Sequence, residues 1–568
     1  MAVLGSASPV PLGEAAATVF VLPVQSELLR VETPLDILRE DPSVFLEQRG
    51  AGGAQSDVVL RGGGFAQTLV LVNGFRINDS QTAHHNLDLP IPLEAMEQIQ
   101  VLHGAGSTLH GADALAGAVD FLTAAPASGS LLLRAGGGNF GENEQGLMAG
   151  GVRGAWSGRI TGDRNFSTGF KADRDYRNED ASAEGWAGSR AGITDVLFAG
   201  SNRAFGADQF YGPFPSWERT KSWFASVRQD IGAKTVAAFG YRRHSDEFVL
   251  IRDEPAIYEN NHVDSSWQAS LRRTQPAGGD SLVLFGLEAD GDSIHSNNLG
   301  RHARNRGAGY ADWDFHPAKR RWMVSAGMRE EIFLGGARSV LSPHLAASRR
   351  ITDRVKVRGN AGYGFRIPTY TDLYYSDPTT VGNANLKPES AWSGEAGMDW
   401  MGSRFTWSAT GFYSHQHDTI DYVRSSPADR WHAENLRGLR FRGLEWSSTW
   451  QPGRGQSLRV GWTALFGAQD ALHGMQSEYV FNYPVENVRA SWNCQLGRYA
   501  VVSNEVQIAQ RFQQSAYPVW NAGIARSRGD WRPYLRLRNG SNTGYEEISG
   551  VPMPGRSVVA GLVYTLGR

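Results

Sequence analysis

The sequence predicts an all-β transmembrane barrel over residues 128–568, following a small α+β module over residues 30–127. Segments in which every second residue is apolar recur throughout the longer region, and this periodicity is that of β-strands. Trp, Tyr and Phe stand near the ends of these segments, as in the aromatic girdles of membrane barrels. No run of roughly 18 or more apolar residues occurs, so the sequence predicts no membrane-spanning helix.

The segment 404–414 shows the alternation. Phe405, Trp407 and Tyr413 fall on one face of the predicted strand, whereas Phe412 interrupts the pattern by falling on the other face. A soluble β-sandwich alternates too, but its strands are usually about 5 to 6 residues long. These runs approach the roughly 9 to 11 residues that cross a bilayer when tilted. At about 20 residues for each strand and its connection, residues 128–568 would form 22 strands, within the even-numbered range of such barrels.

The α+β module has a different pattern. Short apolar runs predict buried strands, a helical turn precedes the third of them, and glycines interrupt the last. The predicted strands are 58–61, 69–72, 99–102 and 117–123, and the turn is 93–98. Residues 124–129, Ala-Ala-Pro-Ala-Ser-Gly, are typical of a linker. Residues 1–29 form a leader without Lys or Arg, so the basic region of a secretory signal is not visible.

Charge and cysteine content argue against several classes of function. The 56 basic and 58 acidic residues are mixed along the chain, which is not the pattern of a protein that neutralises nucleic-acid phosphates. The single cysteine, Cys494, excludes an internal disulfide and a cysteine-based metal cluster. The chain carries no G-x-S-x-G, H-E-x-x-H or P-loop motif, so an enzyme is not indicated and no cofactor is expected.

Motifs in both regions resemble those of TonB-dependent outer-membrane receptors. VVLRGGGFAQTLVLVNGFRIND (58–79) and IPLEAMEQIQVLHGAGSTLHGADALAGAVDFLT (91–123) resemble the plug of that family. Three later segments resemble its barrel signatures and closing strand, in the same order along the chain: GYGFRIPTYTDLYY with GNANLKPES (362–390), ENLRGLRFRGLEW (434–446) and residues 539–566.

The resemblance implies a monomeric 22-stranded barrel in the lipid of the bacterial outer membrane, with the α+β module as a plug inside its lumen. It also implies a receptor that binds a scarce ligand at the cell surface and imports it with energy from the inner-membrane TonB complex. The expected ligand is a ferric siderophore or a cobalamin-like cofactor. Haem is less expected, because no histidine lies between residues 363 and 388. A passive porin or a barrel enzyme is the alternative, and the plug-like module argues against both.

A β-branched run near the N-terminus is the candidate TonB box, and its residues are Thr18, Val19, Phe20, Val21 and Leu22. An extended peptide of this kind can add as a strand to the edge of a partner's sheet. The alternative is an edge strand of the protein itself, or part of the leader.

Four charged residues are candidates for a latch between plug and barrel. Arg61 and Arg76 match arginines of the plug motifs, and Glu395 and Glu445 match glutamates of the barrel wall. Charged side chains are rarely buried without a partner, so we expect these residues to pair, unless each lines a hydrated lumen alone. His103 stands where family plugs often have arginine, which puts one usual ion pair in doubt.

The ligand is expected to meet outward loops of the plug and aromatic loops of the barrel. Aromatic loops suit flat or partly apolar ligands, although an interfacial belt would use the same residues. The adjacent residues His84 and His85 could bind a metal or haem iron, but the sequence indicates no third ligand, so we expect no metal site. The candidates are Phe65, Gln67, Asn78, Gln81, His84, His85, Phe210, Tyr211, Trp217, Tyr374, Tyr375, Tyr479 and Tyr483.

Overall fold

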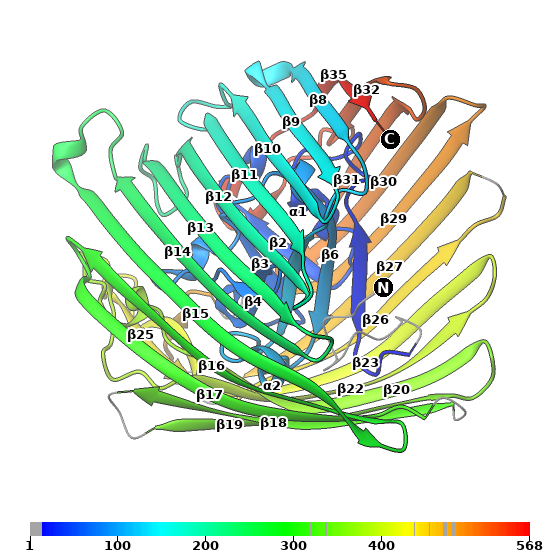
Figure 1. Ribbon diagram of the computed structural model, residues 1–568. Helices are drawn as coiled ribbons and strands as arrows, with labels where there is room; N and C mark the ends of the chain where they lie inside the picture. Colours follow the sequence, from blue (N-terminus) through cyan, green and yellow to red (C-terminus); the bar gives the residue numbers. More distant parts are fainter. Residues whose placement is uncertain are drawn as a thin grey trace.

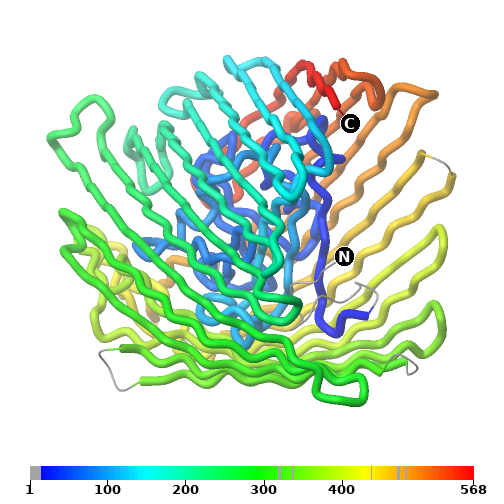
Figure 2. Tube along the Cα trace, viewed as in Figure 1, coloured from blue at the N-terminus to red at the C-terminus, as the bar shows by residue number. Residues whose placement is uncertain are grey.

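The computed structural model describes residues 14–317, 321–334, 338–436, 438–453, 455–469, 474–479 and 483–567. Twenty-two antiparallel strands form one closed barrel, and the N-terminal part of the chain lies inside it (Figures 1 and 2). The predicted fold class is therefore confirmed.

The barrel strands pair with their neighbours in chain order, and the last strand pairs with the first. Val559 lies opposite Gly138 and Leu566 opposite Leu131 across this closing pair. The barrel strands are β8 (Ser130–Gly138), β9 (Asn143–Arg153), β10 (Trp156–Ser167), β11 (Tyr176–Gly188), β12 (Ile193–Gly206), β13 (Trp217–Ile231), β14 (Thr235–Val249), β15 (Glu259–Gly278), β16 (Ser281–Ser296), β17 (Gly300–Phe315), β18 (Trp322–Leu334), β19 (Ser339–Arg350), β20 (Val355–Arg366), β22 (Glu389–Met401), β23 (Phe405–His417), β26 (Leu439–Trp450), β27 (Gln456–Gln469), β29 (Pro484–Leu496), β30 (Ala500–Arg511), β31 (Tyr517–Arg526), β32 (Trp531–Arg538) and β35 (Ser557–Leu566).

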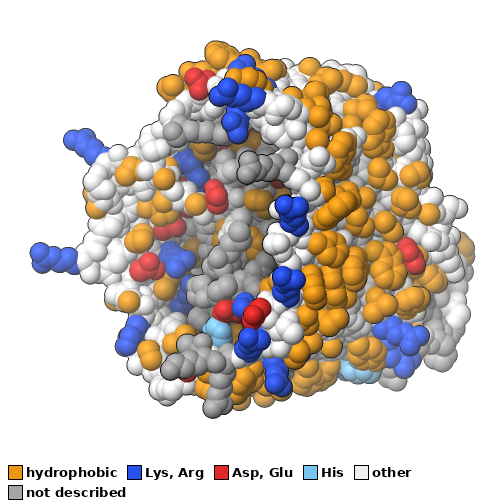
Figure 3. Space-filling model, turned by 90° about the vertical axis from the view of Figure 1, so that its right-hand side faces the viewer, with side chains coloured by type: hydrophobic (Ala, Val, Ile, Leu, Met, Phe, Trp, Pro, Cys, Tyr) orange, Lys and Arg blue, Asp and Glu red, His pale blue; other side chains and the backbone are white. Residues whose placement is uncertain are grey.

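The outer wall of the barrel is apolar. Trp156, Trp223 and Leu287 point outward and keep 69%, 69% and 67% of their surface exposed. Figure 3 shows hydrophobic side chains gathered in a broad band on this wall. A closed barrel satisfies its backbone hydrogen bonds between strands, so such a wall can face lipid without an open sheet edge. Within the described residues, no helix has the length and hydropathy needed to cross a membrane.

The connections between strands differ at the two ends of the barrel. One end carries short turns, and β8 begins and β35 ends on this side. The other end carries longer loops, which we call the long-loop end. These loops contain α3 (Tyr370–Tyr374), β21 (Thr380–Val381), β24 (Thr419–Arg424), β25 (Trp431–Leu436), β28 (Gln476–Ser477), β33 (Glu546–Ile548) and β34 (Val551–Pro552).

The plug is built on a five-stranded sheet in the order β1-β6-β7-β4-β5, in which β4 and β7 are parallel. Its strands are β1 (Val19–Pro23), β4 (Thr68–Val72), β5 (Phe75–Arg76), β6 (Met96–His103) and β7 (Gly117–Thr123). A hairpin of β2 (Val44–Gln48) and β3 (Ser56–Leu60) and the short helices α1 (Pro34–Leu38) and α2 (Ser107–His110) accompany the sheet. Apolar side chains such as Val70, Ile99 and Phe121 are fully buried in its core.

Sequence periodicity located four plug strands, β3, β4, β6 and β7, within a few residues, but it missed β2 and β5. The helical turn expected over 93–98 ends at Ala95, and Met96 already belongs to β6. Many of the barrel strands, however, are longer than a bilayer crossing requires: β15 has 20 residues, whereas β32 has 8. Hairpins of a tilted barrel can continue beyond the hydrocarbon layer, because their backbone groups stay paired there as well.

Candidate functional site: the plug, its latch and the outer loops

Arg61 joins the plug to two glutamates of the barrel wall. Its Nε and Nη2 atoms lie 2.7 and 2.6 Å from the two carboxylate oxygens of Glu445, and its Nη1 lies 2.6 Å from Oε2 of Glu395. The guanidinium also lies over the ring of Phe412, 4.6 Å from its centre. All three charged side chains are buried. Such bidentate, charge-assisted contacts fix the geometry as well as the attraction.

The turn after β3 aims Arg61 at the wall. Arg61 has a φ of +49° and Gly62 a φ of +78°, both in the left-handed region. A side chain at Gly62 would meet the barrel, because an added Cβ would lie 2.7 Å from atoms of Phe441 and Leu465. The backbone therefore approaches the wall closely at a position that only glycine fits.

Glu395 extends this contact to the first strand of the plug. Its Oε1 accepts hydrogen bonds from the amide and hydroxyl of Thr18, at 2.8 and 2.9 Å, and from Asn360 at 2.6 Å. Arg358 of the wall donates to the same oxygen at 3.3 Å and to the Thr18 hydroxyl at 2.5 Å. One buried carboxylate thus binds two separate plug segments.

His103 occupies the position where arginine was expected from related plugs. Its Nδ1 lies 3.3 Å from Glu445, and its Nε2 lies 2.7 Å from Asp41. Burial by itself lowers the pKa of the His103 imidazole, but the Asp41 and Glu445 carboxylates raise it, to about 9. The protonated imidazole supplies a positive charge at this place. Arg61, His103, Glu395 and Glu445 together are called the latch below.

Arg76 has a different partner from the one expected. Its Nη1 lies 2.6 Å from Asp113 and its Nη2 donates to the carbonyl of His110, both within the plug. Its contact with the barrel runs through the backbone, where its amide donates to the side chain of Gln268. The structure therefore brings Arg61, and not Arg76, to the two wall glutamates.

Val19 to Leu22 of the candidate TonB box lie in β1, and Thr18 directly precedes this strand. This strand pairs antiparallel with β6, so that Val19 faces Leu102 and Leu22 faces Ile99. The ring of Phe20 stacks on His103 at 5.4 Å. The segment is thus an edge strand of the plug sheet, which is the alternative that the sequence left open.

Several ligand candidates form two partly exposed aromatic groups at the long-loop end. Phe65 stacks on His84 at 4.3 Å and meets Tyr479 edge-on at 5.4 Å. Tyr374 stacks on His302 at 3.7 Å, and the hydroxyls of Tyr375 and Tyr258 lie 3.4 Å apart. Both groups present flat apolar surface with polar edges.

The remaining candidates lie elsewhere. Asn78 hydrogen-bonds to the backbone of β4, Trp217 begins β13, and the exposed Tyr211 donates to Glu218 at 3.0 Å. The others are buried against the plug, the barrel wall or neighbouring loops, where outward exposure was expected. These buried residues are Gln67, Gln81, His85, Phe210 and Tyr483.

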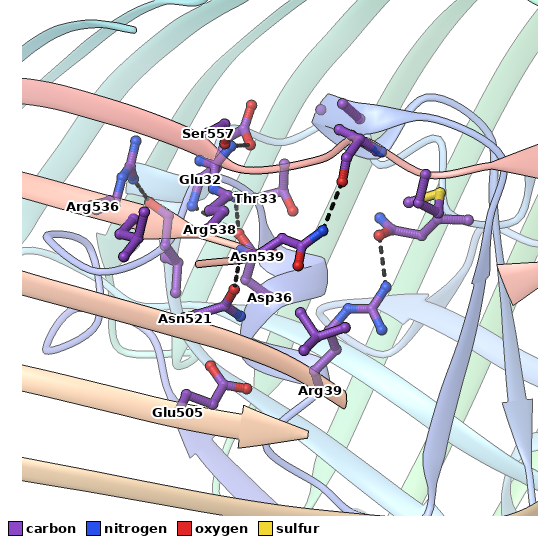
Figure 4. A pocket seen from close by; sticks show the side chains of 18 of the residues that line it. Glu32, Thr33, Asp36, Arg39, Glu505, Asn521, Arg536, Arg538, Asn539 and Ser557 are labelled. Atoms are coloured by element: carbon purple, nitrogen blue, oxygen red, sulfur yellow. Dashed lines mark hydrogen bonds and ion pairs between the residues drawn. The ribbon is translucent and has the colours of Figure 1, made fainter. Parts of the chain in front are cut away.

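A polar cavity of about 170 Å³ separates the plug from another part of the wall (Figure 4). Arg538 of the wall lies 2.5 Å from Glu32 of the plug and 3.1 Å from Glu142. Arg39 of the plug lies 2.7 Å from Glu547. The space is large enough for several water molecules. Sequence reasoning missed this region, because its residues come from distant segments that share no motif.

Two family models match the chain. The model described as "TonB dependent receptor-like, beta-barrel" matches residues 124–542, and that of the "TonB-dependent Receptor Plug Domain" matches residues 14–118.

Curated relatives include vitamin B12 transporters BtuB from two bacteria. The protein of Photobacterium profundum is 27% identical over 452 residues, which cover 74% of this chain and 70% of the relative. That of Vibrio vulnificus is 25% identical over 480 residues, covering 76% of this chain and 72% of the relative.

Solved structures show the same fold at lower identity. The siderophore receptor PirA from Acinetobacter baumannii superposes with a TM-score of 0.81 at 15% identity, covering 98% of this chain and 99% of that one. The copper transporter OprC gives a TM-score of 0.81 at 15% identity, with 100% of each chain covered. With its plug, its closed barrel and both family matches, the chain belongs to the TonB-dependent receptors, a family of outer-membrane receptors and transporters.

Proposed function

We propose that this receptor binds a cobalamin-like corrinoid at the cell surface and imports it through the barrel. The observation that carries the proposal is the similarity to vitamin B12 transporters over about three quarters of the chain. The likeness to siderophore receptors is one of fold, at 15% identity. A ferric siderophore is the second candidate, because the aromatic groups at the long-loop end also suit a flat metal chelate.

The binding surface is assigned to the long-loop end, around Phe65, His84 and Tyr479 on one side and Tyr374 and Tyr375 on the other. These side chains are partly exposed and lie on the plug apex or on loops above the wall. Large ligands bind best where aromatic surface is already held in place, since little conformational freedom is then lost on binding.

The latch holds the plug through polar contacts. An apolar plug surface would have to be exposed to water if the plug moved, whereas ion pairs and hydrogen bonds can be exchanged for water at small net cost. The cavity beside β32 is also lined by charged side chains, so plug and wall meet through polar groups on this side of the plug as well. Release of the plug therefore requires that a few specific polar contacts be broken.

The energy for this release comes from the TonB complex, acting on the N-terminal segment. β1 stands at the edge of the plug sheet, so one of its edges faces away from β6 and can receive an added strand. A pull on β1 would reach Glu395 directly, because Thr18 binds this glutamate.

A binding panel tests the proposed ligand. The purified receptor is mixed with cyanocobalamin, with ferric catecholate and hydroxamate siderophores, and with haem, and affinity is measured by tryptophan fluorescence quenching and by calorimetry. Saturable binding of cyanocobalamin at submicromolar concentration is expected. Binding of a ferric siderophore with no response to cyanocobalamin would select the second candidate, and binding of neither would overturn the proposal.

A further inference from the structure

A second cluster of chemistry-bearing side chains lies between the plug and the wall, toward the long-loop end. His85 belongs to the plug turn η3 (Ala83–His85), Glu218 begins β13 and Asp246 lies near the end of β14. The Nε2 atom of His85 is 3.6 Å from Oε1 of Glu218 and 3.5 Å from Oδ2 of Asp246. One ligand atom from each of the three residues lies within 4.8 Å of the other two, and all three side chains are buried.

The charges in this cluster are not balanced. Nearby, Arg242 lies 2.9 Å from Asp79 and 3.5 Å from Asp264, so these two carboxylates have a cationic partner. Glu218 and Asp246 have no arginine or lysine partner among the described residues, and the imidazole of His85 is their ion-pair contact. Two neighbouring buried carboxylates without a cation are costly, because each repels the other in a medium of low polarity.

Several polar atoms of this cluster and of the neighbouring His262 lack hydrogen-bond partners within the described chain. They include Oε1 of Glu218, Oδ1 of Asp246 and Nδ1 of His262, all buried. His262 lies directly across from Asp246 in the pairing of β14 with β15. Buried polar atoms are nearly always paired in proteins, so this group of atoms indicates a ligand that they share.

The surroundings hold the cluster in a fixed geometry. The side-chain amide of Gln81 donates to Asp246 at 2.7 Å, and the hydroxyl of Tyr211 donates to Glu218 at 3.0 Å. Oδ2 of Asp88 lies 3.7 Å from Nδ1 of His85, on the side of the ring away from the cluster. Metal-binding histidines commonly face a carboxylate through their second ring nitrogen, which orients the ring and fixes its tautomer.

We propose that His85, Glu218 and Asp246 form a binding site for a divalent transition-metal ion such as Zn²⁺, with His262 as the fourth ligand. Imidazole nitrogen with carboxylate oxygen is a donor set that Zn²⁺ accepts, usually with four ligands. Calcium would require six to eight oxygen ligands, which this cluster does not offer. The ion would join the plug turn η3 to β13 and β14. The latch glutamates belong to other wall strands, β22 and β26, so the ion would hold the plug at a second place.

In this assignment the adjacent residues His84 and His85 have different roles. His84 turns away and binds Asp57 at 2.9 Å under the ring of Phe65, at the proposed ligand surface. His85 turns inward to the wall, and the other ligands come from barrel strands more than a hundred residues away along the sequence. Because the metal ligands are buried, the ion is assigned to holding the plug and not to the transported ligand.

Metal content tests the assignment. The receptor is purified without a histidine tag, stripped with a chelator at neutral pH, and titrated with Zn²⁺ by calorimetry, with the bound metal counted by mass spectrometry. One Zn²⁺ per chain is expected for the native protein. His85→Asn should weaken binding at least about tenfold, and Glu218→Gln combined with Asp246→Asn should abolish it. His84→Asn is the matched control and should keep one Zn²⁺ per chain.

Thermal unfolding keeps the test decisive if a variant folds poorly. Zn²⁺ should raise the unfolding temperature of the native protein and of His84→Asn, but not that of the double variant. In chelator, the double variant should unfold no lower than the native protein, because it lacks two uncompensated carboxylates. A native chain that binds no Zn²⁺, or a His85→Asn variant that binds it as tightly as the native chain, would overturn the assignment. In the first case the protonated His85 imidazole alone would balance the carboxylates.

Discussion

Thr18 donates both its backbone amide and its hydroxyl to one carboxylate oxygen of Glu395, whose other oxygen is bound by Arg61. The first strand of the plug and the turn after β3 therefore meet at a single glutamate of the barrel wall. The two hydrogen bonds from Thr18 connect the N-terminal segment of the plug to the latch. Single substitutions can therefore test the latch one residue at a time.

Replacing Arg61 with alanine should loosen the plug strongly. The change leaves Glu395 with Arg358 and Glu445 with His103 as their remaining cations. Breaking a buried ion pair by removing one partner costs up to about 3 to 5 kcal/mol. Arg76→Ala is the matched control, because Arg76 pairs with Asp113 inside the plug. Accessibility of a cysteine placed in the plug to a thiol reagent should rise for Arg61→Ala and stay near the native level for Arg76→Ala. Equal accessibility in both variants would show that Arg61 does not hold the plug.

Gly62→Ala should disturb the same contact through the backbone. The added Cβ would lie 2.7 Å from Phe441 and Leu465 at a φ of +78°, so steric overlap adds to backbone strain. Gly74→Ala is the control, because Gly74 has a φ of +81° but nothing within 4 Å of the added atom. We expect a loss of about 1 kcal/mol for Gly74→Ala and at least about twice that for Gly62→Ala, measured as unfolding free energy. Equal losses would mean that the wall yields at this point.

The latch should weaken at alkaline pH through His103. The pKa of its imidazole in the folded plug is about 9, above its unfolded value of about 6.5. Its contribution to stability is therefore complete below about pH 6.5 and is lost as the pH rises through 9. That contribution is at most about 3 kcal/mol. The measurement compares native protein with His103→Gln across roughly pH 6 to 10, so that the contributions of other titrating groups cancel. Parallel pH profiles would contradict this role.

Proline substitutions should separate a coupling role of β1 from a role in ligand binding. Val19→Pro and Val21→Pro each remove an amide donor and restrict the preceding residue, so at least one should disrupt pairing along β1. The matching alanine variants keep the donor and should be much milder. We expect uptake to fall in a proline variant while surface binding persists. Normal uptake by both proline variants would place the TonB contact elsewhere, and lost binding would mean that β1 supports the fold of the binding surface.

Removing aromatic surface at the long-loop end should weaken ligand binding. Phe65→Ala and Tyr374→Ala each delete a ring that is held by stacking on a histidine, and we expect about a tenfold loss of affinity for each. Trp156→Leu is the control, because Trp156 faces outward from the barrel wall. Fluorescence titration with cyanocobalamin measures the effect. Unchanged affinity in both alanine variants would remove these groups from the binding surface.

The fold was predictable because its signals are local. Alternation along each strand follows directly from which face meets lipid, and the exception at Phe412 has a clear cause: its ring points inward and lies under the guanidinium of Arg61. The pairing of Arg61 with Glu395 and Glu445 was also expected, since buried charges need partners. The partner of Arg76 was not, because Asp113 lies in the plug and nothing in the sequence places the two side chains together.

The outer surface was less predictable than the fold. Whether a loop residue faces the solvent depends on how the plug sits in the barrel, and the sequence alone does not specify this. Gln81 and His85 belong to an outward plug loop, yet they meet the wall strands that carry Asp246 and Glu218. Phe210 likewise turns into an apolar cluster with Tyr176 and Phe205.

Uptake of radiolabelled cyanocobalamin measures TonB-dependent import through this receptor. The receptor is produced in cells that lack their own vitamin B12 transporter, with and without a functional TonB protein, and both surface binding and internal accumulation are measured. We expect binding in both strains, accumulation only when TonB is present, and loss of accumulation when the proton gradient is collapsed. Accumulation that continues without TonB would contradict energised import through a plugged barrel.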